Sequence, residues 1–109
     1  MGNKFKKLSD KNRATIVKRI KRLLAAGLDW CKNTNRDKNY WFSPINPYYC
    51  EAFGVLQALE CLGYGYFGPD FTYQNEYNLK FWFNSLKEEV KQIGESLGEH
   101  ETYAYYREA

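Results

Sequence analysis

Hydrophobic residues recur with the helical period of about 3.6 residues through residues 10–32. Ser9 or Asp10 precedes the first turn, and both residue types cap helix N-termini. Gly27 is open to two interpretations: it ends the helix as a left-handed cap, or it is a small residue that another element approaches closely on a continuing helix. The apolar positions stay in phase beyond it, which favours a helix that ends near residue 32. The apolar stripe comprises Ile16, Val17, Ile20, Leu23, Leu24, Gly27, Leu28 and Cys31.

A second helix is predicted over residues 47–62. Asn46 is suited to cap it and Pro47 to occupy its first position, while Gly63 is suited to end it. Its apolar residues cover more than half of its circumference, so we expect this helix to be the central one, packed between the other two. These residues are Tyr49, Ala52, Phe53, Val55, Leu56, Leu59 and Leu62.

A third helix is predicted over residues 73–97, with Thr72 or Asn75 near its start and Gly98 at its end. Its apolar residues alternate four and three positions apart, which is typical of the seam of a helical bundle or coiled coil. The tail over residues 99–109 shows no clear period, so it either docks as a short helix or stays loose. The seam consists of Leu79, Phe83, Leu86, Val90, Ile93 and Leu97.

The segments between these helices contain turn formers rather than strands. Residues 33–46 hold several Asn residues and a Ser-Pro step, and residues 63–70 interleave glycines with aromatics. The run Tyr40–Phe42 could be extended, but no second strand of comparable quality is available to pair with it. We therefore predict an all-α fold, a compact three-helix bundle of one domain over residues 1–109, with long aromatic-rich loops and a basic arm over residues 1–8.

The composition indicates a folded, cytoplasmic protein. Of the 109 residues, 44% are hydrophobic and 18% aromatic, which is enough for a core and excludes intrinsic disorder. No apolar run approaches the roughly 18 residues needed to cross a bilayer, and the first residues lack the apolar region of a signal peptide. The third-helix seam and the strongly apolar second helix offer more apolar surface than one chain covers, so we expect a homodimer.

The net charge of +3 conceals an asymmetry along the chain. Residues 1–54 carry twelve Lys or Arg against four Asp or Glu, whereas residues 55–109 carry four against nine. Either the two ends attract each other within the fold, or the basic end binds an acidic partner such as DNA or RNA. In the second interpretation the nucleic-acid-binding residues are Lys4, Lys6, Lys7, Lys11, Lys18, Arg19 and Arg22.

Residues that could carry catalysis are few and scattered. The single histidine, His100, lies in a charged stretch of the tail. Glu88 and Glu89 are adjacent on a predicted helix and point about 100° apart, which is unsuited to sharing a proton. The three cysteines show neither zinc-ligand spacing nor a basic neighbour that would activate a thiol. We therefore expect free thiols, no metal, no cofactor and no enzyme activity.

Aromatic residues are concentrated in residues 40–77, which hold twelve rings. A three-helix core of this length does not readily bury so many, and exposed Tyr and Trp are residue types that anchor protein interfaces. We expect a small non-enzymatic protein-binding module that inhibits a host protein or protein–nucleic acid complex, like the anti-defence (anti-CRISPR-like) proteins of phages and mobile elements. The predicted partner-binding residues lie in loops and are Tyr40, Trp41, Tyr64, Tyr66 and Phe67.

Overall fold

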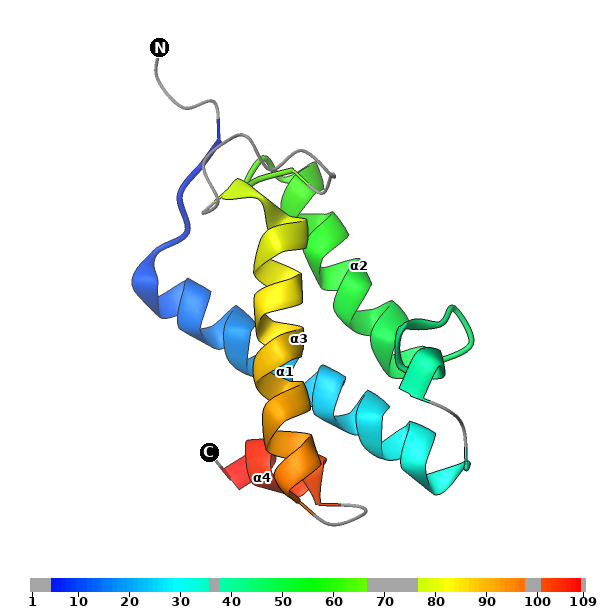
Figure 1. Ribbon diagram of the computed structural model, residues 1–109. Helices are drawn as coiled ribbons and strands as arrows, with labels where there is room; N and C mark the ends of the chain where they lie inside the picture. The colour runs from blue at the N-terminus through cyan, green and yellow to red at the C-terminus, as the bar shows by residue number, and fades with distance from the viewer. Residues whose placement is uncertain (1–4, 36–37, 67–76, 98–100, 109) are drawn as a thin grey trace.

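The computed structural model describes residues 5–35, 38–66, 77–97 and 101–108, and these form four α-helices and one short 3-10 helix (Figure 1). The all-α prediction is confirmed, but the number of helices is four rather than three. The described residues contain an isolated bridge between Tyr66 and Asn78 but no strand. The elements are α1 (Asp10–Asn33), η1 (Lys38–Phe42), α2 (Pro47–Cys61), α3 (Leu79–Ser96) and α4 (Thr102–Glu108).

The predicted ends of the first two helices agree with the structure to within one residue. The Ser9 side chain caps α1 by accepting the backbone N–H of Asn12 at 3.1 Å. The Asn46 side chain caps α2 by accepting the backbone N–H of Tyr48 at 3.1 Å. Gly63 follows α2 with a φ of 88°, the left-handed conformation that glycine adopts without strain.

Gly27 lies inside α1, so the second of its two interpretations is confirmed. The side chain of Asn46 lies against it, and its Nδ2 donates to the carbonyl oxygens of Gly27 at 3.2 Å and of Trp41 at 3.1 Å. Asn46 is fully buried. It therefore caps α2 and at the same time joins that helix to the backbone of α1.

The third helix begins later than predicted, at Leu79 instead of residue 73. The Tyr66 backbone N–H donates to the Tyr77 carbonyl at 3.0 Å, and the Leu79 N–H donates to the Tyr66 carbonyl at 2.8 Å. This pairing holds the backbone before α3 against the segment that follows α2, and Asn78 then caps α3. Residues 73–76 of the predicted helix lie outside the described residues.

The central helix is α1 and not α2, which corrects the prediction. α1 contacts η1, α2, α3 and α4, and it crosses behind α3 in Figure 1. α2 buries only Ala52, Leu56 and Leu59, while Leu62 just beyond its end is 59% exposed. The physical reason is that the tail over residues 102–108 folds as α4 and packs on α1, so α1 has neighbours on more sides than α2.

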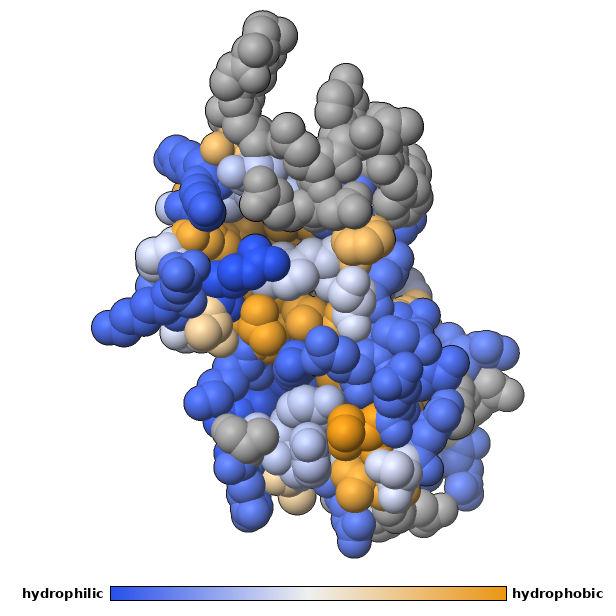
Figure 2. Space-filling view, turned by 60° about the vertical axis from the view of Figure 1, so that its left-hand side comes forward, coloured by the Kyte–Doolittle hydropathy of each residue, from blue (hydrophilic) through white to orange (hydrophobic). Residues whose placement is uncertain are grey.

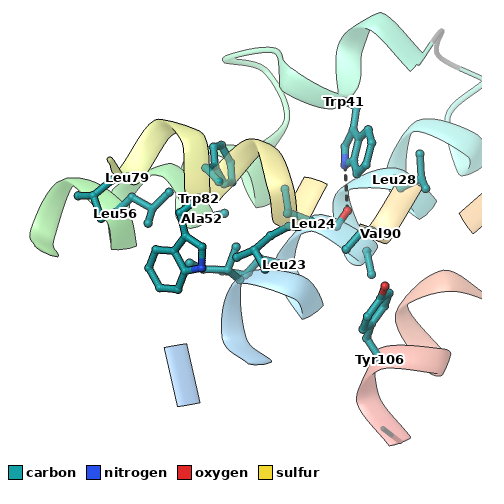
Figure 3. Close-up of a cluster of buried hydrophobic side chains, with 14 of the residues drawn as sticks. Leu23, Leu24, Leu28, Trp41, Ala52, Leu56, Leu79, Trp82, Val90 and Tyr106 are labelled. Atoms are coloured by element: carbon teal, nitrogen blue, oxygen red, sulfur yellow. Dashed lines mark hydrogen bonds between the residues drawn. The ribbon is translucent and has the colours of Figure 1, made fainter. Parts of the chain in front are cut away.

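The core gathers around the middle of α1 (Figure 3). Trp41 was expected in a loop that reaches a partner, and this is wrong: it lies in η1 and is 4% exposed. Its indole N–H donates to the Leu24 carbonyl at 2.9 Å, so this buried polar group has a hydrogen-bond partner. Tyr106 brings an aromatic ring from α4 into the same cluster.

Candidate protein-binding groove

The five aromatic residues expected to bind a partner do not form one surface. Trp41 lies in the core. Tyr40 is 43% exposed on η1, just before α2 begins, whereas Tyr64 and Tyr66 are half-buried beyond the opposite end of α2. Phe67 lies outside the described residues. The length of α2 therefore separates Tyr40 from the other two.

A different set of aromatic residues converges on a groove of about 580 Å³ that lies between α1, α2 and α4. Trp30 comes from α1, Tyr48 from the first turn of α2 and Tyr103 from α4. Tyr48 is 36% exposed and Tyr103 39%, and Trp30 is half-buried. We call this site the tyrosine groove. Its other lining residues are Arg19, Arg22, Leu23, Ala26, Asp29, Asn33 and Glu51.

Two arginines on α1 bond to the other two helices that line the tyrosine groove, α2 and α4. Arg19 Nη2 lies 2.7 Å from Glu51 Oε1 on α2, and both side chains are about half exposed. Arg22 donates from Nε to the Tyr106 carbonyl at 3.3 Å and from Nη2 to the Arg107 carbonyl at 3.2 Å. These carbonyls belong to the last turn of α4, where a cation is favoured by the helix dipole.

Asp29 holds the other end of α4. Its carboxylate, on a residue only 6% exposed, accepts the backbone N–H of Thr102 at 3.3 Å and of Tyr103 at 2.9 Å. A carboxylate at a helix N-terminus satisfies backbone donors that have no partner within the helix, and the dipole favours its charge. α1 therefore forms hydrogen bonds with both ends of α4, and these contacts place Tyr103 on the rim of the groove.

The tyrosine groove has no net formal charge in its lining, since two arginines balance Asp29 and Glu51. All four of these side chains already bond within the chain. What the groove offers a ligand is thus mainly aromatic and apolar area, framed by polar groups in fixed positions. Tyr, Trp and Arg around a partly desolvated hollow are the residue types that dominate protein-binding hot spots.

Some of the basic side chains of α1 are paired with other groups within the fold. Lys21 Nζ lies 2.6 Å from Glu89 Oε2, which pairs the basic first helix with the acidic second half of the chain. The Arg13 guanidinium lies over the Trp82 ring at 4.6 Å from its centre. The Lys21–Glu89 pair, with the bonds of Arg22 to the end of α4, supports the first of the two interpretations of the charge pattern, whereas Glu51, the partner of Arg19, lies in the basic half itself.

Other predicted nucleic-acid-binding residues remain on the surface. Lys6 lies over the Tyr64 ring, with Nζ 5.8 Å from the ring centre. Three further lysines are exposed, and their side chains form no ion pair or hydrogen bond with another described residue; they are Lys7, Lys11 and Lys18. Lys4 lies outside the described residues.

The candidate catalytic groups do not converge in the part of the chain that the structure describes. No group of three His, Cys, Asp or Glu side chains there could hold a metal ion. The three cysteines are not joined in a disulfide: Cys31 is buried, while Cys50 and Cys61 are exposed. His100 lies outside the described residues. No helix over the described ranges is both long enough and apolar enough to span a bilayer.

The chain matches no protein-family model, no curated protein and no solved structure. We therefore infer function from the tyrosine groove, a site that the sequence pattern did not predict. One signal was available, because Trp30 lies off the apolar stripe of α1, and a large aromatic residue there needs cover from another element. Tyr48 and Tyr103 carried no comparable local signal, since their approach to Trp30 depends on how α2 and α4 pack on α1.

Proposed function

We propose that this chain is a non-enzymatic protein-binding module that recognises its partner through the tyrosine groove. The observation that carries the proposal is the convergence of Trp30, Tyr48 and Tyr103, from three different helices, on one hollow. The role that we propose is inhibition of a larger host complex by occupying one of its surfaces, as small proteins of phages and mobile elements do. For such a role binding is sufficient and catalysis is not needed.

Rigidity of the groove supports this proposal. Its walls are joined to α1 by the Arg19–Glu51 ion pair, the Arg22 contacts and the Asp29 cap. A preformed site loses little conformational entropy on binding, and Tyr side chains provide large contact area with few rotatable bonds. A partner with a projecting apolar or aromatic side chain fits this arrangement, because the charged groups of the groove already have partners.

The proposal is tested by affinity capture from nuclease-treated lysate of the native host, followed by a binding titration with the captured protein. We expect one stoichiometric protein partner. Tyr48→Ala and Tyr103→Ala should each weaken its binding by about 30-fold, the loss typical of hot-spot aromatics. Circular dichroism of each variant should show unchanged helix content, since both side chains are more than one third exposed.

Tyr40→Ala is the matched control. Tyr40 is 43% exposed, similar to the two groove tyrosines, but it does not line the groove. Its truncation should leave the affinity unchanged. Equal losses in all three variants, or no loss in either groove variant, would show that the partner uses a different surface. Capture of no protein from treated lysate, together with capture of nucleic acid from untreated lysate, would move the function to the second candidate.

The second candidate is a nucleic-acid-binding protein that uses the basic N-terminal region. It is favoured by Lys11 and Lys18, which are both exposed and lie seven residues apart, hence on the same side of α1. Arg19 and Arg22 support it less, because both already bond to protein groups. A lysine that has no protein partner can reach a phosphate without first breaking a contact.

This candidate predicts affinity for DNA or RNA at about 50 mM salt that falls steeply as salt is raised. The double variant Lys11→Glu, Lys18→Glu should abolish that affinity, while Tyr48→Ala should keep it. Absence of binding at low salt, or equal binding by the double variant, would exclude this use of the helix.

A further inference from the structure

A second hollow lies on the other side of α1 from the tyrosine groove. It has a volume of about 700 Å³ and is bounded by α1, α3 and α4. Its apolar lining comes from Ala14 and Val17 on α1 and Ile93 on α3, with the rings of Tyr105 and Tyr106 on α4. Figure 2 is turned toward the side on which the first half of α1 lies, and apolar side chains reach the surface there among hydrophilic ones. We call this site the α3–α4 hollow.

Among the charged groups around the α3–α4 hollow, one cation has neither an ion-pair partner nor a ring contact in the part of the chain that the structure describes. Lys21 and Glu89 neutralise each other at 2.6 Å, and the Arg13 guanidinium lies over the Trp82 ring. Lys18 lines the hollow next to Val17, is exposed, and forms no ion pair with any described residue. Asp10, the remaining carboxylate in the lining, belongs to the first turn of α1, where the helix dipole compensates its charge.

We propose that the α3–α4 hollow binds an amphiphilic organic anion, an apolar chain or ring system that carries one carboxylate. Its volume falls within the range of about 300–1,000 Å³ that is common for small-molecule sites, and an apolar floor with few polar groups is typical of them. The apolar part of the ligand covers Val17 and Ile93, and the carboxylate pairs with the Lys18 ammonium at the rim. Arg13 adds a second positive charge on the same helix.

The tyrosines of α4 fit this ligand class. The exposed Tyr105 ring meets Tyr106 edge to face, with ring centres 5.0 Å apart, so the wall of the hollow presents aromatic surface. Burial, with added effects of Glu89 and Tyr105, raises the pKa of Tyr106 to about 12. Its phenol, like any tyrosine whose pKa lies at or above the ordinary value of 10.0, is neutral at physiological pH and does not repel an anion.

The test compares three probes with the same twelve-carbon chain: dodecanoate, dodecanol and dodecyltrimethylammonium, each below its critical micelle concentration. Titration calorimetry with the full chain should give the tightest binding for dodecanoate, with the cationic probe at least about tenfold weaker, as expected for one charge pair near a protein surface. Amide chemical shifts should change at α1, α3 and α4 around the hollow.

Two variants test the site independently. Lys18→Glu should reduce dodecanoate affinity by about tenfold or more, because it replaces the Lys18 ammonium by a carboxylate. Ala14→Trp should block the hollow, since Ala14 is exposed and lines it, so the added ring does not have to enter the core. Lys11→Glu is the matched control, an exposed lysine of the same helix that does not line the hollow. It should leave the affinity unchanged.

The proposal is overturned if dodecanoate does not bind, if the cationic probe binds as well, or if both Lys18→Glu and Ala14→Trp leave the affinity unchanged. Should Ala14→Trp lose helix content, the charge variant and its control decide the question. The inference is separate from the protein-binding function, because Tyr48→Ala should weaken binding of the protein partner and keep dodecanoate binding.

Discussion

The carboxylate of Asp29, buried in α1, accepts the backbone N–H of Tyr103 at 2.9 Å and so caps a helix that begins 73 residues later in the chain, at Thr102. Through this contact α1 determines where α4 lies. Because α4 forms a wall of both the tyrosine groove and the α3–α4 hollow, one buried side chain supports both proposed sites.

Replacing Asp29 should release α4. We expect Asp29→Ala to lower the free energy of unfolding by about 1–2 kcal/mol, the effect of losing a helix cap that also satisfies buried donors. Hydrogen exchange should show faster exchange of the amides in residues 102–108 than in the other helices. Glu101→Gln, which alters the exposed carboxylate next to α4, is the control and should change neither quantity appreciably. Unchanged protection of α4 in Asp29→Ala would contradict the capping role.

Two helical glycines should respond in opposite directions to substitution by alanine. A Cβ on Gly94 would collide with the buried Leu28 side chain, so Gly94→Ala should destabilise the fold by about 1–3 kcal/mol. A Cβ on Gly54 would meet nothing within 4 Å, so Gly54→Ala should stabilise it by about 1 kcal/mol through higher helix propensity. Denaturant titrations of both variants measure these changes. Effects of the same sign would show that α3 does not approach α1 as closely as the structure has it.

Stability should fall at alkaline pH because of Tyr106. Its pKa in the folded state is raised to about 12, chiefly by burial, from the ordinary value of 10.0. Between these values the unfolded chain releases the proton more readily than the folded chain, so the free energy of unfolding decreases as the pH rises from about 10 to about 12. Tyr106→Phe removes this group and should show a smaller decrease in denaturant titrations across that range. Tyr103→Phe, at an exposed ring of the same helix that does not contribute to the shift, should behave like the original chain.

The homodimer expected from the sequence stays a prediction, but one of the two arguments for it, an uncovered seam on the third helix, no longer applies. Leu79, Phe83, Leu86 and Val90 of the α3 seam are buried within the chain. Of the large hydrophobic side chains in the described residues, Leu62 at the end of α2 is the most exposed, at 59%. Light scattering should give twice the chain mass of 12.9 kDa, and Leu62→Glu should reduce it to that mass. A mass of 12.9 kDa for the unaltered chain at micromolar concentration would exclude the dimer.

The elements that could be derived from the sequence are those with local causes. α1 and α2 follow from apolar periodicity and from capping residues that lie next to the helices they cap, such as Ser9, Asn46 and Gly63. The absence of paired strand signals was sufficient for the all-α class. These features depend on residues a few positions apart, so the local sequence contains the whole reason for them.

The remaining features depend on contacts between residues far apart in the chain. The first backbone donors of α4 bind the Asp29 carboxylate, which reaches them only when α1 is already folded. Tyr77 and Asn78 stay out of α3 because Tyr66 bonds to the Tyr77 carbonyl and the Leu79 N–H on either side of Asn78, and Trp41 can be buried because the Leu24 carbonyl accepts its N–H. The tyrosine groove has the same origin, since Trp30, Tyr48 and Tyr103 meet only through the packing of α2 and α4 on α1. Periodicity identifies which side of a helix is buried, whereas the neighbour that buries it is chosen by tertiary hydrogen bonds and packing.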